Sequence, residues 1–154
     1  MAVHKIRAAV HSDLGELARM CELLWPDVPA EEHARERDEI LSTRKFGTLP
    51  GEILVSYAEN GALTGFIEVG LRSHADGCDF KQPVGYVEGW FVRETFRNQG
   101  VGRLLMRTAE DWARSQGCLE IASDTWISNE GSQHAHQALG FEVVDRCVHF
   151  RKNL

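Results

Sequence analysis

The chain has few cysteines, no excess of positive charge and no long apolar run. Its four cysteines lie far apart and form no Cys-x-x-Cys pair, so neither a disulfide framework nor a zinc site is predicted, and we expect no metal. The formal net charge of −6 argues against nucleic acid or a membrane surface as a partner and favours a cationic ligand. No stretch approaches the roughly 20 apolar residues that span a bilayer, and no signal-peptide pattern is recognised. We therefore expect a cytoplasmic protein.

The composition, with 43% hydrophobic and 26% charged residues, fits one folded domain over residues 1–154. In the N-terminal half, Asp13 followed by Glu16 predicts a capped helix start. Asn60-Gly61 predicts a hairpin turn between two β-rich runs. The predicted elements, in chain order, are a strand over 5–10, a helix over 13–24, a polar surface helix from 29 to about 44, and strands over 53–58 and 63–71.

The most informative motif is Arg97-Asn98-Gln99-Gly100-Val101-Gly102, which joins a strand-like run over 86–92 to an amphipathic helix. A glycine-rich turn between a strand and a helix directs several backbone N–H groups at one point, and the positive end of the helix dipole lies behind them. Such a turn binds phosphate, although a simple capped turn is the alternative. The order of its glycines differs from the dinucleotide-binding motif and from the P-loop.

The residues that follow this motif narrow the interpretation. The helix has one apolar face and ends before Gly117, a short strand is predicted over 118–122, and a helix over 129–139 is closed by Gly140-Phe141. This order resembles the GNAT superfamily, whose members transfer the acetyl group of acetyl-CoA to an amine. The resemblance implies an α/β fold of the α+β type, with a single mixed, mostly antiparallel sheet, splayed central strands and about four flanking helices. It also implies acetyl-CoA as the cosubstrate, bound by Trp90, Phe91, Val92, Arg97, Asn98, Gln99, Gly100, Val101, Gly102, Arg103 and Asn129.

Shorter segments are similar to those of bacterial aminoglycoside 6′-N-acetyltransferases. They are Leu24-Trp25-Pro26, Asp76-Gly77-Cys78-Asp79, Val87-Glu88-Gly89-Trp90-Phe91-Val92, Ala122-Ser123-Asp124-Thr125 and His136-Gln137-Ala138-Leu139-Gly140-Phe141. In this group the substrate is a cationic aminoglycoside, acetylation confers antibiotic resistance, and the enzymes are often homodimers. The resemblance assigns substrate contacts to Trp25, Glu88, Asp124 and Asp145 of the last strand, with His74 as the nearest counterpart of a loop tyrosine.

The acidic residues also stand out on physical grounds. Glu88 lies in an otherwise apolar strand, where an unpaired charge costs several kcal/mol, so it needs either an internal partner, Arg72 or Arg103, or a cationic ligand. Asp124 follows a buried run, at the end of a strand where open α/β sheets place ligands, or it caps the helix that follows. Asp145 is either a substrate contact or solvated surface.

The resemblance implies direct transfer of the acetyl group, without a covalent enzyme intermediate. Glu88 or Asp124 is the candidate general base that accepts a proton from the ammonium group, directly or through water. Backbone N–H groups near Phe91-Val92 polarise the thioester carbonyl. His136 stands where the family has a tyrosine that protonates the CoA thiolate, and it is either this acid or a packed histidine. Two other functions remain open: acetylation of another amine, such as a polyamine or a protein terminus, and an inactive acetyl-CoA-binding module.

Overall fold

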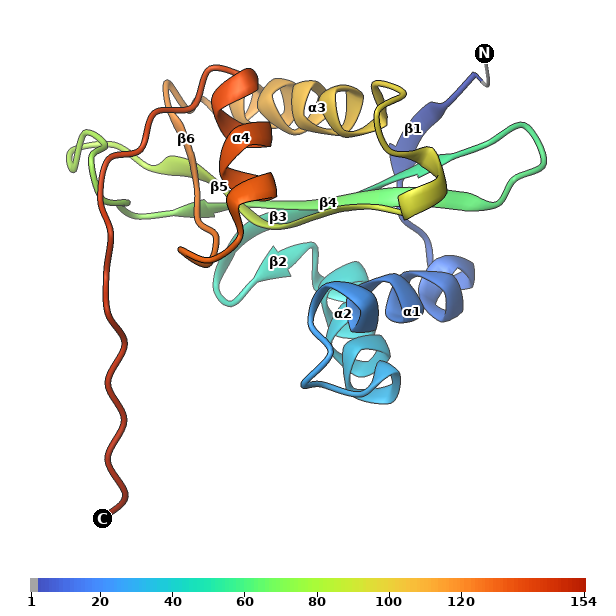
Figure 1. The fold of residues 1–154 in the computed structure, drawn as a ribbon, viewed down its shortest axis with the longest axis horizontal. Helices are drawn as coiled ribbons and strands as arrows, with labels where there is room; N and C mark the ends of the chain where they lie inside the picture. The colour runs from blue at the N-terminus through green and yellow to red at the C-terminus, as the bar shows by residue number, and fades with distance from the viewer. Residues whose placement is uncertain (1–2) are drawn as a thin grey trace.

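The computed structural model describes residues 3–154 and has one sheet with helices on both faces (Figure 1). Short 3-10 helices at His11–Asp13 and Glu94–Phe96 precede two of the longer elements. In the described residues no helix combines the length and apolar character needed to cross a bilayer. The elements are β1 (Lys5–Ala8), α1 (Leu14–Leu24), α2 (Ala30–Thr43), β2 (Lys45–Phe46), β3 (Leu49–Tyr57), β4 (Leu63–Arg72), β5 (Val84–Val92), α3 (Val101–Ser115), β6 (Ile121–Ser123) and α4 (Glu130–Ala138).

The sheet is mixed and mostly antiparallel. Its strand order is β1-β3-β4-β5-β6, with β2 paired to β3, and among the strands of residues 3–154 only β5 and β6 run parallel. β6 pairs with residues 85–87 of β5, whereas β5 continues to Val92, so the two strands diverge beyond Val87. These strands and the four α-helices confirm the predicted fold class, including the splayed central strands.

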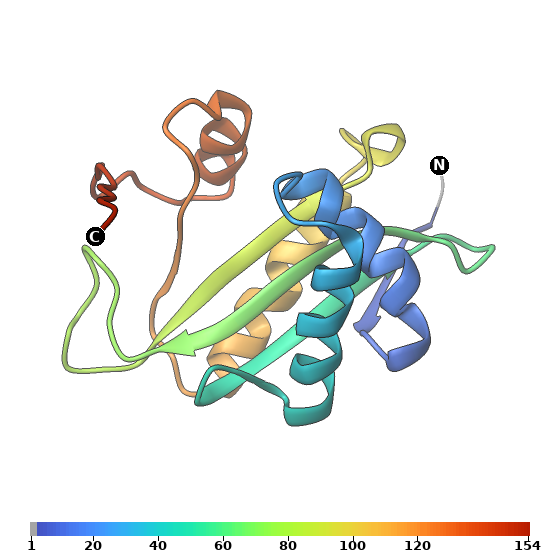
Figure 2. The same ribbon diagram turned by 90° about the horizontal axis from the view of Figure 1, so that it is seen from below.

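Each face of the sheet has its own helices and core. α3 covers one face, and α1 and α2 cover the other (Figures 1 and 2). Because side chains alternate along a strand, Phe66 of β4 packs with Leu17 on the α1 face, while Ile67 packs with Leu105 on the α3 face. The same alternation directs Glu68 toward α2. β4 is therefore the central strand, buried on both sides.

The helix start predicted from Asp13 and Glu16 is confirmed, since α1 begins at Leu14 with Asp13 as its N-cap residue, but the Asp13 side chain makes no capping hydrogen bond to α1. Asp13 Oδ2 accepts a hydrogen bond from Val10 N at 2.9 Å and forms an ion pair with Arg7 at 2.6 Å. Glu16 Oε2 accepts from Leu63 N at 3.1 Å. Arg7 and Leu63 come from β1 and β4, so both carboxylates bind partners that the sequence near them does not reveal.

Several strand boundaries differ from the predicted ones. β1 ends at Ala8 rather than at residue 10, and the strand predicted over 118–122 is β6 at Ile121–Ser123. β2 was not predicted, because two residues are too few to show an alternating pattern. The hairpin at Asn60-Gly61 is confirmed, since β3 and β4 pair antiparallel across it.

The C-terminal segment, residues 141–154, follows α4 and runs away from the sheet as an extended chain (Figure 1). Within the described chain, no backbone hydrogen bond joins residues 142–154 to a strand. The last strand expected around Asp145 is therefore not formed in the single chain. Val148 is 76% exposed and Phe150 is 93% exposed, although both are apolar.

Candidate active site

The turn at residues 97–102, which we call the phosphate turn, has the backbone geometry of an anion site. Gly100 has a φ of 82°, and a Cβ added there would meet no atom within 4 Å. α3 begins at Val101, and its first backbone hydrogen bond runs from Leu104 N to Gly100 O at 3.0 Å. The N–H groups of Val101 and Gly102 therefore have no partner within the helix. These unpaired N–H groups, with open space beside Gly100, suit the pyrophosphate of acetyl-CoA.

Two side chains of the phosphate turn brace it through the main chain. Arg97 Nε donates to Val92 O at 2.9 Å. Gln99 Nε2 donates to Thr95 O at 3.0 Å. Asn98, between them, has a left-handed φ of 60°. These contacts hold the turn in shape and leave its backbone as the binding element.

β5 passes beside the phosphate turn with one edge open. Gly102 lies so close to the strand that an added Cβ would come within 3.2 Å of Trp90 Cζ2. Phe91, on the opposite face, is buried in the α1 core. Because β6 pairs only as far as Val87, the main-chain groups of residues 88–92 on that edge have no strand partner, and apart from Val92 O, which accepts from Arg97, they are left for a ligand. This matches the place expected for the N–H groups that polarise a thioester.

A cavity between α3 and α4 extends the same region, with a volume of ≈ 190 Å³. Asn129, an expected cosubstrate contact, accepts a hydrogen bond at Oδ1 from Ser132 N at 3.0 Å and so caps α4. Two arginines line the cavity, which suits an anionic part of the cosubstrate. Its lining is Arg103, Met106, Arg107, Glu110, Ala138 and Leu139.

Glu88 lies at an irregularity of β5. The register pairs Glu68 with Gly89 and Val69 with Val87, which leaves Glu88 as the extra residue of a β-bulge. The internal partner considered from the sequence is present, and it is Arg72: its Nε donates to Glu88 Oε1 at 3.0 Å and its Nη2 to Oε2 at 2.8 Å. Such bidentate pairs are among the stronger hydrogen-bonded contacts in proteins.

Asp124 is brought to the same place by Tyr86. The parallel register sets Tyr86 opposite Ala122, and its hydroxyl donates to Asp124 Oδ2 at 2.7 Å. Burial, and then the bond to Asp124, raise the pKa of Tyr86, so the phenol stays a donor. Asp124 does not cap the following helix, because Asn129 does, and that alternative is wrong. We call Glu88, Tyr86 and Asp124 the acidic subsite.

Tyr86 was missed as a site residue. It precedes Glu88 by two positions, so the two side chains share one face of β5, and this spacing is the signal that points to it. The guanidinium of Arg72 lies 3.4 Å from the centre of the Tyr86 ring. The structure therefore groups two carboxylates and an aromatic face around one cation.

Trp25, the expected cover of a sugar ring, packs against the sheet next to Glu88. It directly follows α1, and a Cβ added to Gly89 would come within 2.5 Å of Trp25 Cη2. Its ring centroid lies 6.3 Å from that of Phe66. The missing side chain of Gly89 thus lets the indole lie on β5 beside the acidic subsite.

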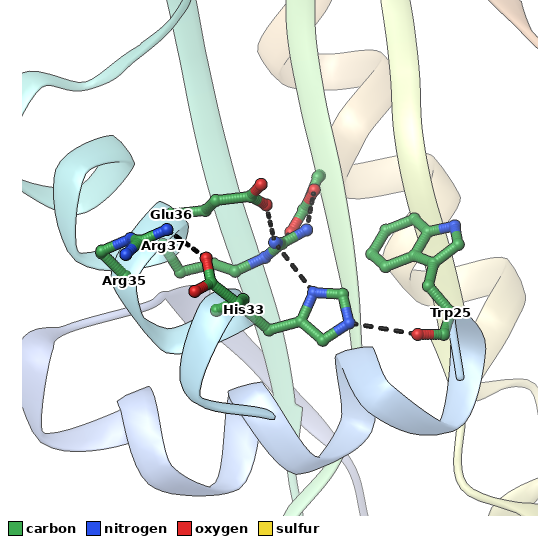
Figure 3. Close-up of polar contacts among 7 residues, drawn as sticks. Trp25, His33, Arg35, Glu36 and Arg37 are labelled. Atoms are coloured by element: carbon green, nitrogen blue, oxygen red, sulfur yellow. Dashed lines mark hydrogen bonds and ion pairs between the residues drawn. The ribbon is translucent and has the colours of Figure 1, made fainter. Parts of the chain in front are cut away.

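A buried polar network supports Trp25 from α2 (Figure 3). Arg37 Nε donates to Glu68 Oε1 at 2.8 Å, and its guanidinium lies 5.2 Å from the Trp25 ring centre. Arg37 Nη1 donates to Glu36 Oε2 at 2.7 Å and lies 3.3 Å from His33 Nδ1. His33 Nε2 lies 3.2 Å from Trp25 O. The network ties the end of α1 to α2 and to the central strand.

The polar surface helix expected over residues 29–44 is formed as α2, and this network adds a buried polar face that was not expected. α2 buries His33 and Arg37, and Glu68 opposite them is 2% exposed. Burial raises the pKa of Glu68, and Arg37 opposes this shift. Like Glu88, Glu68 interrupts an apolar strand, and the same signal would have found it in the sequence.

His136 is packed and hydrogen-bonded at both ring nitrogens. Nδ1 lies 2.7 Å from Ser132 O, and Nε2 lies 2.8 Å from Ser123 Oγ. Its ring meets Trp90 and Phe141 edge-on. This is the geometry of the packed alternative, and the contact with Ser123 also brings the imidazole next to the strand that ends in the acidic subsite.

The structure does not bring His74 and Asp145 to the acidic subsite. His74 is exposed in the loop after β4, with Nδ1 3.0 Å from Ser73 Oγ. Asp145 accepts only from Arg146 N, at 2.7 Å, among the described residues. Both lie in segments without regular structure, which packing within one chain does not fix.

The four cysteines are free thiols. Cys21 and Cys118 are buried, Cys147 is exposed, and none is in a disulfide. Burial raises the pKa of Cys21 to about 12, so its thiolate is not available near neutral pH.

Comparisons with known proteins agree with this geometry. Residues 17–141 match the acetyltransferase (GNAT) family. An aminoglycoside N(6′)-acetyltransferase type 1 of Klebsiella aerogenes is 42% identical over 90% of this chain and 88% of its own, and one of Stenotrophomonas maltophilia is 36% identical over 97% and 93%. The structure of AAC(6′)-Iy in complex with a bisubstrate analogue, CoA-S-monomethyl-acetylneamine, superposes with a TM-score of 0.86 at 33% identity, covering 99% of both chains.

Proposed function

The chain belongs to the acetyltransferase (GNAT) family, and from that premise we propose that it transfers the acetyl group of acetyl-CoA to the 6′-amine of aminoglycosides, conferring resistance. The observation that carries this proposal is the acidic subsite beside the open edge of β5. Glu88 binds Arg72 there and Asp124 is joined to the same place by Tyr86, so two carboxylates lie near one another, and aminoglycosides are polycations. The relatives named above have the same activity in their names.

The cosubstrate is held by the phosphate turn and by the open edge of β5. The N–H groups at the start of α3 bind the pyrophosphate, and those near Phe91-Val92 face the acetyl group. When bound, acetyl-CoA supplies an activated acetyl thioester. Gly100 leaves the space above the turn open, which supports this assignment.

The substrate amine must lose a proton before it attacks. Asp124 is the better placed base, because Tyr86 uses its Oδ2 and no described residue donates to its Oδ1. Glu88, with both oxygens on Arg72, holds a second ammonium group when the substrate binds. Trp25 then covers a sugar face.

We assign the proton for the departing thiolate to His136. In its neutral form Nδ1 carries the hydrogen toward Ser132 O and Nε2 accepts from the Ser123 hydroxyl. A protonated His136 reverses the second bond, so its proton reaches the site through Ser123. Changing His136 to Gln should lower kcat more than it raises the KM for acetyl-CoA.

We further propose a homodimer in which the C-terminal segment crosses to a second copy. The segment is extended, carries exposed Val144, Val148 and Phe150, and has no strand partner within the described chain. β6 is an edge strand of three residues, which a crossing strand can extend. A crossed segment also carries Asp145 to the partner's site. Light scattering should give a dimer for the full chain and a monomer for a chain ending at Glu142.

The 6′ assignment is tested with paired substrates. Kanamycin and tobramycin carry a 6′-amine and should be acetylated once, whereas paromomycin has a hydroxyl there and should bind while giving little product. Spermidine and a peptide amine, assayed for thiol release in parallel, should be poor substrates. NMR showing acetylation at another ring amine, or paromomycin turnover equal to that of kanamycin, would remove the 6′ assignment.

A further inference from the structure

Arg72 occupies the place where a substrate cation is expected. Its guanidinium makes two hydrogen bonds to Glu88, at 3.0 and 2.8 Å, and stacks at 3.4 Å on the ring of Tyr86. Its pKa is raised, chiefly by the bonds to Glu88, and the charge of Asp124 adds to the shift. All three members of the acidic subsite therefore act on this one side chain.

The subsite and its occupant differ in how firmly they are held. Tyr86 is 7% exposed within the sheet, and the Glu88 side chain is 25% exposed. The Arg72 side chain is 43% exposed and stands at the last residue of β4. The guanidinium can therefore leave toward solvent while the carboxylates and the ring stay in place.

The pair of Arg72 with Glu88 is bidentate, but it can still exchange. The Arg72 side chain is 43% exposed, so water competes with Glu88 for the guanidinium and solvates it once it leaves. An incoming ammonium group can replace the guanidinium on Glu88 without leaving a bare carboxylate at any stage. Binding then exchanges one cation for another, and its net free energy is reduced by the pair that is lost.

We propose that Arg72 is a built-in cation that keeps the acidic subsite in shape when no substrate is bound and is displaced by an ammonium group of the substrate. Arg72 thereby weakens substrate affinity and raises the requirement for a well-placed cation. It is a specificity-determining residue. This role rests on the proposed function for the identity of the substrate, but the cation subsite itself is testable without it.

The first experiment uses methylguanidinium, which is the head of the missing side chain. Arg72→Ala should bind it in an NMR titration, with shifts centred on Glu88 and Tyr86, and the Arg72→Ala/Glu88→Gln double variant should not. The wild-type protein should show no shift at Glu88 or Tyr86 when methylguanidinium is added. Equal binding by all three proteins, or none by Arg72→Ala, would overturn the proposal, whatever the substrate is.

The second experiment measures kanamycin binding by calorimetry. Arg72→Ala should bind it about fivefold more tightly than wild type, and methylguanidinium should return the affinity to the wild-type value. Weaker or unchanged binding would show that Arg72 only positions Glu88, and would overturn the displacement. If wild type neither binds nor acetylates kanamycin, the proposed function fails instead, and the methylguanidinium result still decides the subsite.

Arg44 provides the matched control. It pairs with Glu52 and has similar exposure, 50% for the arginine and 19% for the glutamate, but lies at the other end of α2 from Trp25. Arg44→Ala should leave the kanamycin affinity unchanged, with or without methylguanidinium. Should Arg72→Ala fold poorly, Arg72→Gln removes the charge while keeping most of the packing on Tyr86, and the same tightening is expected.

Discussion

The phosphate turn and the acidic subsite are built in opposite ways. The turn consists of six consecutive residues, and its chemistry comes from backbone N–H groups and a glycine with positive φ. The acidic subsite joins Tyr86 to Asp124, 38 positions apart, through side chains alone. The turn should therefore be sensitive to changes that disturb the backbone, whereas the subsite should be sensitive to the loss of single polar atoms.

The largest expected effect comes from the buried support of Trp25. Arg37→Met leaves Glu68 without its partner and should reduce the free energy of unfolding by about 3–5 kcal/mol. The Arg37→Met/Glu68→Met double variant should regain most of it, because two apolar residues need no partner. Urea unfolding measures both. A double variant as unstable as the single one would show that the network does more than neutralise one charge.

The phosphate turn is tested through Gly100. Gly100→Val should weaken acetyl-CoA binding by about a hundredfold, roughly 2.7 kcal/mol, because the side chain would enter the space above the N–H groups. Gly61 is a matched control: its φ is also 82° and an added Cβ meets nothing within 4 Å. Gly61→Val should bear the same backbone strain and bind acetyl-CoA normally. Equal calorimetric affinities in the two variants would contradict the phosphate assignment.

Changes to the carboxylates of the acidic subsite should affect catalysis with the aminoglycoside and leave the binding of acetyl-CoA intact. Glu88→Gln and Asp124→Asn should each lower kcat/KM for kanamycin. The loss of transition-state stabilisation should be about 1.5–3 kcal/mol, the value of a charge-assisted hydrogen bond. Acetyl-CoA binding should persist in both. Steady-state kinetics with each substrate varied in turn gives the answer, and wild-type values in both variants would mean that the substrate lies elsewhere.

The smallest expected effect concerns one hydroxyl. Tyr86→Phe removes the 2.7 Å hydrogen bond to Asp124 and should lower kcat/KM for kanamycin. The corresponding loss of transition-state stabilisation should be about 0.5–1.5 kcal/mol. Tyr57, the other tyrosine of the chain, also lies beside an arginine, with Arg7 at 5.3 Å from its ring, and Tyr57→Phe should have no such effect. An equal loss of kcat/KM in both variants would show that the change comes from lower stability and not from the acidic subsite.

Short-range patterns in the sequence predicted individual strands, the hairpin and the phosphate turn, whereas the sheet with its splayed strands was implied by the resemblance to the GNAT superfamily. Alternation along 63–71, Asn-Gly at 60–61 and the glycines at 100 and 102 act within a few residues. The helix start at Asp13 had the same local basis and is confirmed, but the carboxylates of Asp13 and Glu16 bind Arg7 and Leu63 instead of capping the helix.

Glu88 shows how far such patterns reach. A carboxylate in an apolar strand must have a partner, and the sequence by itself required one and named Arg72 and Arg103 as candidates. Only the tertiary structure identified Arg72 as the partner of Glu88, because the register of β4 on β5 and the bulge at Glu88 set which side chains meet.

The sequence by itself determined the order of strands and helices and the glycine turn at residues 97–102, because backbone conformation follows from residue type and spacing, and its motifs implied the GNAT sheet by resemblance. Only the tertiary structure showed that the Tyr86 ring stacks on Arg72, that Arg37 pairs with Glu68 behind Trp25, and that the C-terminal segment forms no strand. Those contacts join residues far apart in the chain, and their geometry depends on strand register and on helix packing, which no local pattern encodes.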